Sequence, residues 1–190
     1  MKTGIFGGTF DPVHIGHVRA TEAFVYELAL DRLFVLPNCL PPLKDKESAS
    51  AEDRLAMLKI AFSDMEGVQV DDFELKNGGT SYTYKTIEHY RALFPQDRLF
   101  LLIGDDNLLI FRKWVNFDYI IKNCTICVAA RSGADITRDT AVLKQKYNAD
   151  IRVLSYTPTV ISSTELRERL TVDLLPVGVY DFIREKGLYR

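Results

Sequence analysis

Short apolar runs alternate with amphipathic stretches along most of this chain, and this alternation constrains the fold more than any other feature. Helical patterns occupy most of the intervals between the apolar runs, at 16–30, 50–62, 84–94 and 137–147. Strands that alternate with helices in this way form a mostly parallel sheet with helices on both faces. The sequence therefore predicts an α/β fold of the Rossmann-like, doubly wound type. The predicted strands are 3–7, 32–37, 68–75, 98–104, 125–130 and 151–155.

The last part of the chain departs from this alternation. Two helical patterns, 161–170 and 177–190, are separated by Pro176, with no strand between them. A chain of 190 residues, of which 47% are hydrophobic, is long enough to bury one full core. The expected organisation is a single domain at 1–190, made of a core at 1–155 and a small C-terminal helical subdomain at 156–190.

Composition excludes several classes of protein. The net charge of −2 argues against general nucleic-acid binding, which requires a basic face, and no apolar stretch reaches the length of a membrane span. The N-terminus lacks the apolar run of a signal peptide, and the three cysteines are an odd number that suits a reducing cytoplasm. Cys124 and Cys127 lie three apart on a predicted strand, so their thiols point to opposite faces. We expect both to be buried strand residues, and neither a redox pair nor a zinc site.

The stretch "GIFGGTFDPVHIGHV" (4–18) joins the first predicted strand to the first predicted helix. Gly7 and Gly8 end the strand, and Gly16 and His17 open the helix. Unpaired N–H groups and the helix dipole favour an anion at such a junction, and glycines let a phosphate approach the backbone. The spacing is neither the G-x-G-x-x-G of dinucleotide-binding folds nor a P-loop, which disfavours a hydride-transfer enzyme and a P-loop ATPase. The stretch thus predicts a phosphate site.

A second candidate phosphate site is "ISSTELR" (161–167). Ser162 and Glu165 have the spacing of a capping box, which leaves other N–H groups at the helix start for an anion. Arg167 follows one turn later and can add a charge-assisted hydrogen bond to phosphate. Alone, this motif favours an ordinary capped helix. Together with the N-terminal stretch, it favours phosphate binding.

These two motifs carry a resemblance to a known family. "GGTFDPVHIGH" resembles the opening of the nucleotidylyltransferase superfamily, whose H-x-G-H binds ATP phosphates, and "ISSTELR" resembles its I-S-S-T-x-[IL]-R. The letters HIGH also occur in class I aminoacyl-tRNA synthetases. A chain of 190 residues has no room for their anticodon-binding domain, and it lacks their K-M-S-K-S loop.

Three further stretches narrow the resemblance to the nicotinate-nucleotide adenylyltransferases. "LPNCLPPLK" (36–44) is similar to their P-N-x-x-P-P-[HK]-K loop, and "TSYTYKT" (80–86) is similar to their S-Y-T-x-x-T segment. "IGDDNLLIFRKW" (103–114) is similar to their I-G-x-D-x-L-x-x-F-x-x-W. The family would place Arg131, in "AARSG", beside the adenine.

The resemblance implies transfer of AMP from ATP to nicotinate mononucleotide, giving deamido-NAD and pyrophosphate in NAD biosynthesis. It implies catalytic roles for His14 and His17, and Mg²⁺ bound mainly through ATP phosphates and water. Lys44 would hold the acceptor phosphate, Tyr82 and Thr83 would lie near the pyridine substituent, and Trp114 would stack on the pyridine ring. The implied ATP-binding residues are Gly7, Gly8, Thr9, Phe10, His14, His17, Gly104, Asp106, Arg131, Ser162, Ser163, Thr164 and Arg167.

Alternatives remain open at this point. Other transferases of the superfamily, such as pantetheine-phosphate adenylyltransferase or a cytidylyltransferase, share the first motif, and a non-catalytic nucleotide sensor could share both glycine turns. The spacing of residues does not separate an acid from an amide on the pyridine, nor does it decide whether the chain forms a homo-oligomer. Leu43 departs from the histidine that many family members carry before the lysine. We expect Asp105 to face solvent and His89 to lie at the surface.

Overall fold

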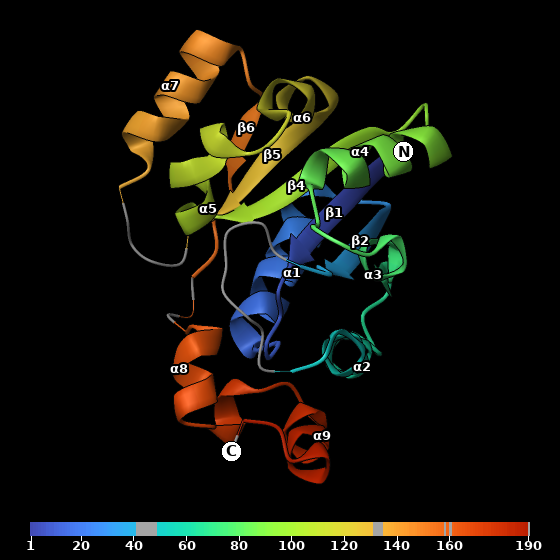
Figure 1. The fold of residues 1–190 in the computed structure, drawn as a ribbon. Coiled ribbons are helices and arrows are strands. Elements are labelled where there is room, and N and C mark those ends of the chain that lie inside the picture. The colour runs from blue at the N-terminus through green and yellow to red at the C-terminus, as the bar shows by residue number, and fades with distance from the viewer. Residues whose placement is uncertain (41–48, 131–134, 158, 160, 190) are drawn as a thin grey trace.

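The computed structural model describes residues 1–40, 49–130, 135–157, 159 and 161–189. Within these ranges, six parallel strands form one sheet in the order β3-β2-β1-β4-β5-β6 (Figure 1). The chain moves outward from β1 to β3, crosses back to β4 beside β1, and then moves outward on the other side. This reversal defines a doubly wound sheet, as predicted. The strands are β1 (Lys2–Gly8), β2 (Arg32–Pro37), β3 (Val68–Val70), β4 (Arg98–Gly104), β5 (Cys124–Ala129) and β6 (Ile151–Val153).

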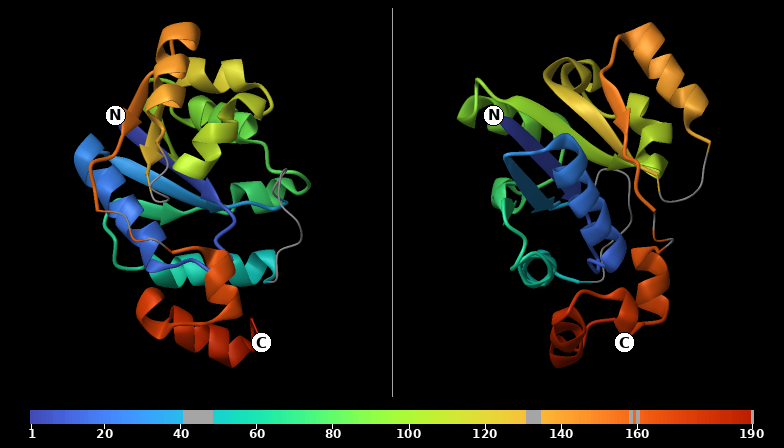
Figure 2. Two further views of the ribbon diagram at one scale, coloured as in Figure 1. Left: turned by 90° about the vertical axis from the view of Figure 1, so that its left-hand side faces the viewer. Right: turned by 180° about the vertical axis from the view of Figure 1, so that it is seen from behind.

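Helices connect the strands and cover both faces of the sheet (Figure 1, Figure 2). Among the helices that the structure describes, none combines the length and the apolar character that spanning a membrane requires. The helices are α1 (Ile15–Leu28), α2 (Ala51–Ala61), α3 (Phe73–Asn77), α4 (Thr83–Leu93), α5 (Asp105–Ile110), α6 (Phe117–Asn123), α7 (Thr137–Tyr147), α8 (Ser163–Glu168) and α9 (Val179–Lys186), with 3-10 turns η1 (Phe111–Lys113) and η2 (Val172–Leu174).

The core has two layers, one on each face of the sheet. Successive strand residues alternate between them: Ile5 belongs to the layer that contains buried residues of α4, α5, α6 and α7, and Phe6 belongs to the layer that contains those of α1 and α2. Cys124 and Cys127 are free, buried, and divided between the same two layers. The expectation that these thiols point to opposite faces is therefore confirmed.

The C-terminal helices pack against the layer that contains α1 and α2. Leu166 of α8 and Val179 and Ile183 of α9 are buried in that layer. Figures 1 and 2 show α8 and α9 together at one end of the molecule, next to α2. Helix α9 ends before Gly187, which has a φ of 65° in the left-handed region that favours glycine at a helix C-terminus.

The predicted strand 68–75 is wrong beyond Val70. The Asp71 carboxylate accepts a hydrogen bond of 2.8 Å from the Phe73 N–H, and this short turn ends the strand and leads into α3. A strand of three residues at the edge of a sheet limits pairing with other chains.

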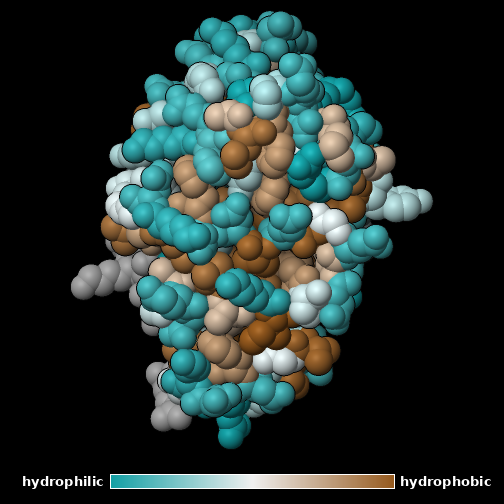
Figure 3. Space-filling model, turned by 90° about the vertical axis from the view of Figure 1, so that its right-hand side faces the viewer, coloured by the Kyte–Doolittle hydropathy of each residue, from teal (hydrophilic) through white to brown (hydrophobic). Residues whose placement is uncertain are grey.

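The side of the molecule that lies to the right in Figure 1 has a central hydrophobic zone bordered by hydrophilic residues (Figure 3).

Candidate active site

A cleft of about 990 Å³ lies at the carboxyl ends of β1 and β4, where the strand order reverses. Its volume suits a ligand of the size of a nucleotide. Lys44 and Arg131 lie outside the described residues. The other predicted site residues all line this cleft: Gly7, Gly8, Thr9, Phe10, His14, His17, Tyr82, Thr83, Gly104, Asp106, Trp114, Ser162, Ser163, Thr164 and Arg167.

The loop after β1 is shaped by close packing around Phe10. This residue is buried, and its φ of 52° is unusual for a side chain of its size. Its ring contacts Phe6 and His17 edge to face, with centroid distances of 5.2 and 5.0 Å. A Cβ on Gly8 would lie 2.9 Å from the Phe10 ring, so the turn requires glycine at that position.

The two histidines of this loop stack on each other, with ring centroids 3.7 Å apart. The His14 N–H donates to His17 Nδ1 over 3.2 Å. In a neutral His17 ring, this acceptor role of Nδ1 places the proton on Nε2, which becomes a donor. A Cβ on Gly16 would lie 3.0 Å from His14 Nδ1, so the glycine makes room for the His14 ring.

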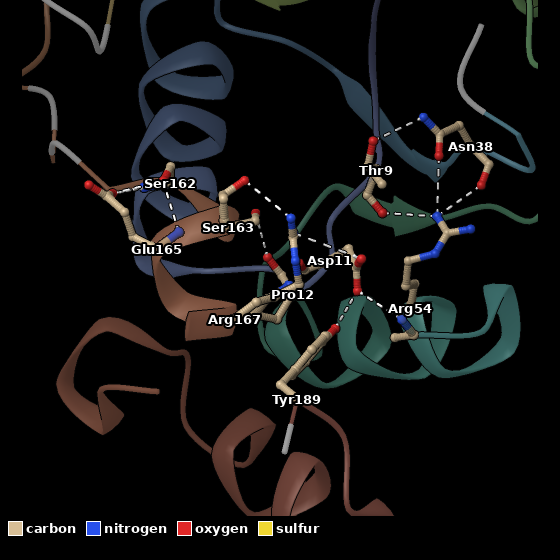
Figure 4. A network of polar contacts seen from close by, with 12 residues as sticks. Thr9, Asp11, Pro12, Asn38, Arg54, Ser162, Ser163, Glu165, Arg167 and Tyr189 are labelled. Atoms are coloured by element: carbon tan, nitrogen blue, oxygen red, sulfur yellow. Dashed lines mark hydrogen bonds and ion pairs between the residues drawn. The ribbon is translucent and has the colours of Figure 1, made fainter. Parts of the chain in front are cut away.

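Helix α8 faces this loop from the C-terminal end of the chain (Figure 4). The predicted capping box is present: Ser162 Oγ accepts from the Glu165 N–H over 3.2 Å, and the Ser162 N–H donates to Glu165 over 3.1 Å. The hydrogen bond of 2.8 Å from the Ser162 hydroxyl to the Glu165 carboxylate, followed by the one from the Ser162 N–H, lowers the pKa of that carboxyl below its usual value. Ser163 donates to the Pro12 carbonyl over 3.0 Å, and Arg167 donates to the Asp11 carbonyl over 2.7 Å.

Asp11 connects this loop to the end of the chain (Figure 4). Its buried carboxylate accepts a hydrogen bond of 2.6 Å from the hydroxyl of Tyr189, 178 residues away, and another of 3.2 Å from the Ala49 N–H. Burial, followed by the hydrogen bond to Asp11, raises the pKa of Tyr189 above its usual value. Sequence reasoning missed this contact, because nothing in the local pattern around Tyr189 indicates its partner.

The opposite wall of the cleft contains the residues that the resemblance assigns to the acceptor. Tyr82 is the N-cap of α4 and Thr83 is its first residue, so both lie at a helix start, as expected. Trp114 is half-buried and packs edge to face on Phe111, with a centroid distance of 5.1 Å.

Glu74 also lines this wall and was missed, because "DDFEL" carries no motif. Thr86 donates a hydrogen bond of 2.6 Å to its carboxylate. Burial raises the pKa of Glu74 above its usual value, although hydrogen bonds from Thr86 and Ser81 oppose the rise.

The expectation that Asp105 faces solvent is wrong. Asp105 is fully buried, because it starts α5 directly after β4 and its carboxylate accepts from the Asp106 N–H over 3.0 Å. His89 is partly exposed at the surface, and its ring stacks on Phe73 with a centroid distance of 3.8 Å.

The polar side chains that line the cleft include hydroxyls, two imidazoles, two amides, Lys113, Arg167 and the carboxylates of Asp11, Glu74 and Asp106. Among the described residues there is no group of three or more His, Cys, Asp or Glu side chains that could hold a metal ion. The cleft therefore fits a cation that is coordinated mainly by anionic oxygens of the bound ligand.

Comparison with known proteins agrees with this geometry. The family model described as cytidylyltransferase-like matches residues 5–169. A relative from Neisseria meningitidis serogroup A, named probable nicotinate-nucleotide adenylyltransferase, is 36% identical over 99% of this chain and 98% of its own length. A protein of the same name from Clostridium tetani is 36% identical over 100% and 99% of the two chains.

Solved structures share the fold. The nicotinic acid mononucleotide adenylyltransferase of Plasmodium falciparum complexed with APC aligns with a TM-score of 0.80 at 17% identity, covering 99% of this chain and 96% of that one. A putative nicotinate-nucleotide adenylyltransferase from Vibrio parahaemolyticus aligns with a TM-score of 0.71 at 20% identity, covering 100% and 95%. The match of the family model and the full-length relatives lead to one conclusion: this chain belongs to the cytidylyltransferase-like family, and within it to the nicotinate-nucleotide adenylyltransferases.

Proposed function

We propose that this protein transfers the adenylyl group of ATP to nicotinate mononucleotide, forming nicotinate adenine dinucleotide and releasing pyrophosphate. The observation that carries the proposal is the meeting of two phosphate-type motifs across one cleft. Arg167 and Ser163 of α8 donate to the carbonyls of Asp11 and Pro12, so the two motifs form one continuous wall. The burial of α8 and α9 residues in the shared core supports a single working domain over 1–190.

In this proposal, one wall of the cleft holds the triphosphate. His14 and His17 donate hydrogen bonds to the α- and β-phosphates, where charge increases as the bond to the leaving pyrophosphate breaks. The hydrogen bond from the His14 N–H to His17 Nδ1 keeps His17 in the tautomer that can donate from Nε2. Ser162, Thr164 and Arg167 hold the β- and γ-phosphates from the start of α8.

The nucleoside end of ATP uses the turns beside the sheet. Backbone N–H groups around the glycine turn that begins at Gly7 approach the phosphates closely, and Gly104 and Asp106 contact the ribose. Arg131, which follows β5 in the sequence, lies beside the adenine in this proposal.

The second wall binds the acceptor. The phosphate of nicotinate mononucleotide is already an anion at neutral pH, so its oxygen attacks the α-phosphorus in line without a general base. Lys44 holds that phosphate, Trp114 stacks on the cationic pyridine ring, and donors at the α4 start around Tyr82 and Thr83 bind the nicotinate carboxylate. Catalysis then consists of positioning two anions and stabilising the transition-state charge.

A Mg²⁺ ion that accompanies ATP would supply neutralisation of phosphate charge. We propose that ATP oxygens and water provide most of its ligands, because the described residues contain no cluster of three or more potential metal ligands. The chain's own contribution is to hold the triphosphate in the orientation that permits in-line attack.

The test is pyrophosphate release by the purified protein with ATP and Mg²⁺, comparing nicotinate mononucleotide with nicotinamide mononucleotide. We expect the acid to give a kcat/KM on the order of 10–100-fold higher, because charge-assisted hydrogen bonds at the α4 start would be lost with the amide. Equal rates with both would overturn the proposed acid specificity. No release with either would overturn the proposed reaction. Release with 4′-phosphopantetheine as acceptor would then indicate the pantetheine-phosphate alternative, and ATP binding without any release would indicate the sensor alternative.

A further inference from the structure

Arg54 of α2 is one of the most deeply buried side chains described, with 1% of its surface exposed. Its Nη1 donates to the Thr9 carbonyl over 2.9 Å, to the Asn38 carbonyl over 2.9 Å and to Asn38 Oδ1 over 3.2 Å (Figure 4). Its Nη2 reaches the Cys39 carbonyl over 3.4 Å. Burial of a guanidinium raises the free energy of the folded state unless hydrogen-bond acceptors surround it. These oxygens offset the cost of burying the Arg54 cation.

The acceptors belong to two different loops of the site. Thr9 follows β1 and lies on the triphosphate wall, whereas Asn38 and Cys39 follow β2 and begin the segment that contains Lys44. The two loops also touch directly, because Asn38 Nδ2 donates to Thr9 Oγ1 over 3.3 Å.

The second loop is tied to the acceptor wall as well. The Cys39 N–H donates to Ser81 Oγ over 2.8 Å, next to Tyr82. Arg54 therefore stands at the junction between the wall proposed for the triphosphate and the wall proposed for the acceptor.

We propose that Arg54 is a positioning residue that fixes the two substrate walls relative to each other. This inference rests on the proposed function, and it assigns to Arg54 no contact with either substrate. Each wall keeps its own binding groups when Arg54 is changed, whereas the alignment of the acceptor phosphate with the α-phosphorus depends on the shared guanidinium. An in-line reaction is sensitive to such alignment, since a displacement of about 1 Å can cost on the order of 10²-fold in rate.

The chain offers a matched control in Arg91 of α4. This half-buried arginine also joins backbone carbonyls from two segments, because it donates to Asp97 over 2.7 Å and to Asn123 over 2.6 Å. Those carbonyls immediately precede β4 and β5, so they lie at the amino end of the sheet, far from the cleft. Arg91→Lys therefore reproduces the loss of a carbonyl-bridging guanidinium without touching the site.

The experiment compares Arg54→Lys with Arg91→Lys and with the unchanged protein. A lysine ammonium keeps the charge but lacks the planar fork that spans oxygens of two loops. We expect Arg54→Lys to lower kcat on the order of 10–100-fold, while the Kd for ATP alone and for nicotinate mononucleotide alone, measured by calorimetry, change less than about threefold. Arg91→Lys should leave kcat unchanged even where its thermal midpoint falls as much as that of Arg54→Lys.

Other outcomes decide against the proposal. A folded Arg54→Lys protein with kcat within twofold of the unchanged protein would overturn it. So would a parallel weakening of both binary affinities, which indicates general loosening rather than misalignment. If Arg54→Lys does not fold, Asn38→Ala removes one acceptor and the contact with Thr9, and the same loss of kcat at constant binary Kd is expected on a smaller scale. An unchanged protein without any activity would instead refute the proposed reaction.

Discussion

Arg54 and Arg91 make the same type of contact at opposite ends of one sheet, and their surroundings differ. At the carboxyl end, Arg54 and Asp11 are buried beside a cleft, where their hydrogen bonds fix loops that line it. At the amino end, Arg91 and Asp97 join strand starts that lie away from this cleft and do not line it. Ligands of open α/β sheets bind beyond the carboxyl ends of the strands. An arginine that joins backbone carbonyls of two segments therefore positions the site loops at the carboxyl end, whereas at the amino end it stabilises the fold.

The ion pairs follow the same division. At the amino end, Asp97 pairs with the N-terminal amine at 3.3 Å and with Arg32 at 3.4 Å, and Arg98 pairs with Asp150 at 2.7 Å on the surface. The carboxyl end relies mainly on hydrogen bonds to backbone carbonyls and to the buried Asp11 carboxylate, with a longer ion pair of 3.9 Å between Arg167 and Asp11. We therefore expect changes at the carboxyl end to affect turnover first and changes at the amino end to affect unfolding first.

The largest effect is expected for His17→Ala. Loss of one donor to developing phosphate charge should lower kcat by roughly 10²–10³-fold, with a small loss of stability because the hydrogen bond from the His14 N–H also disappears. Steady-state pyrophosphate release measures the change. His89→Ala is the matched control, since its ring stacks on Phe73 outside the cleft. Similar activity of both variants would remove His17 from the chemistry and would weaken the contrast between the two ends.

Much of the carboxyl end could be predicted because its signals are local. The glycines, the histidines and the capping box of α8 are each encoded within a few consecutive residues, and the structure brings these segments together. The parallel sheet could likewise be predicted from the alternation of apolar runs and helical patterns.

The features that could not be predicted depend either on contacts between residues far apart in the chain or on a local turn that replaces a predicted strand. The Tyr189 contact with Asp11 spans 178 residues, and the acceptors of Arg54 lie 15 to 45 residues away in the chain. Helices α5 and α6 are too short to show a helical period, and at 68–75 a turn at Asp71 overrides an apparently continuous strand. Burial of Asp105 likewise follows from how α5 leaves β4 and not from any pattern in its own neighbours.

A smaller effect on the same side of the sheet is expected for Trp114→Ala. Loss of an indole face that stacks on a pyridinium should raise the KM for nicotinate mononucleotide about tenfold, while the KM for ATP stays within about twofold. Trp114→Phe keeps an aromatic face and should recover part of the loss, including the packing on Phe111. A rise in the KM for ATP alone would place Trp114 on the wrong substrate and would require the two walls to be exchanged.

The smallest effect on activity, and the sharpest test of the amino end, is expected for Asp97→Asn. The hydrogen bond from Thr3, followed by attraction to the N-terminal amine and Arg32, holds the pKa of the Asp97 carboxyl below its usual value of 3.8. A lowered native pKa means that the ionised group stabilises the fold fully above pH 3.8 and loses this contribution as the pH falls below that value. The thermal midpoint of Asp97→Asn should therefore lie below that of the unchanged protein at pH 7, and the two should converge under more acidic conditions. Unfolding curves from pH 7 to about pH 2.5 measure the convergence, and kcat at pH 7 should be unchanged. A variant that lost turnover but not stability would show that the amino end also shapes the site, and the division between the two ends of the sheet would no longer hold.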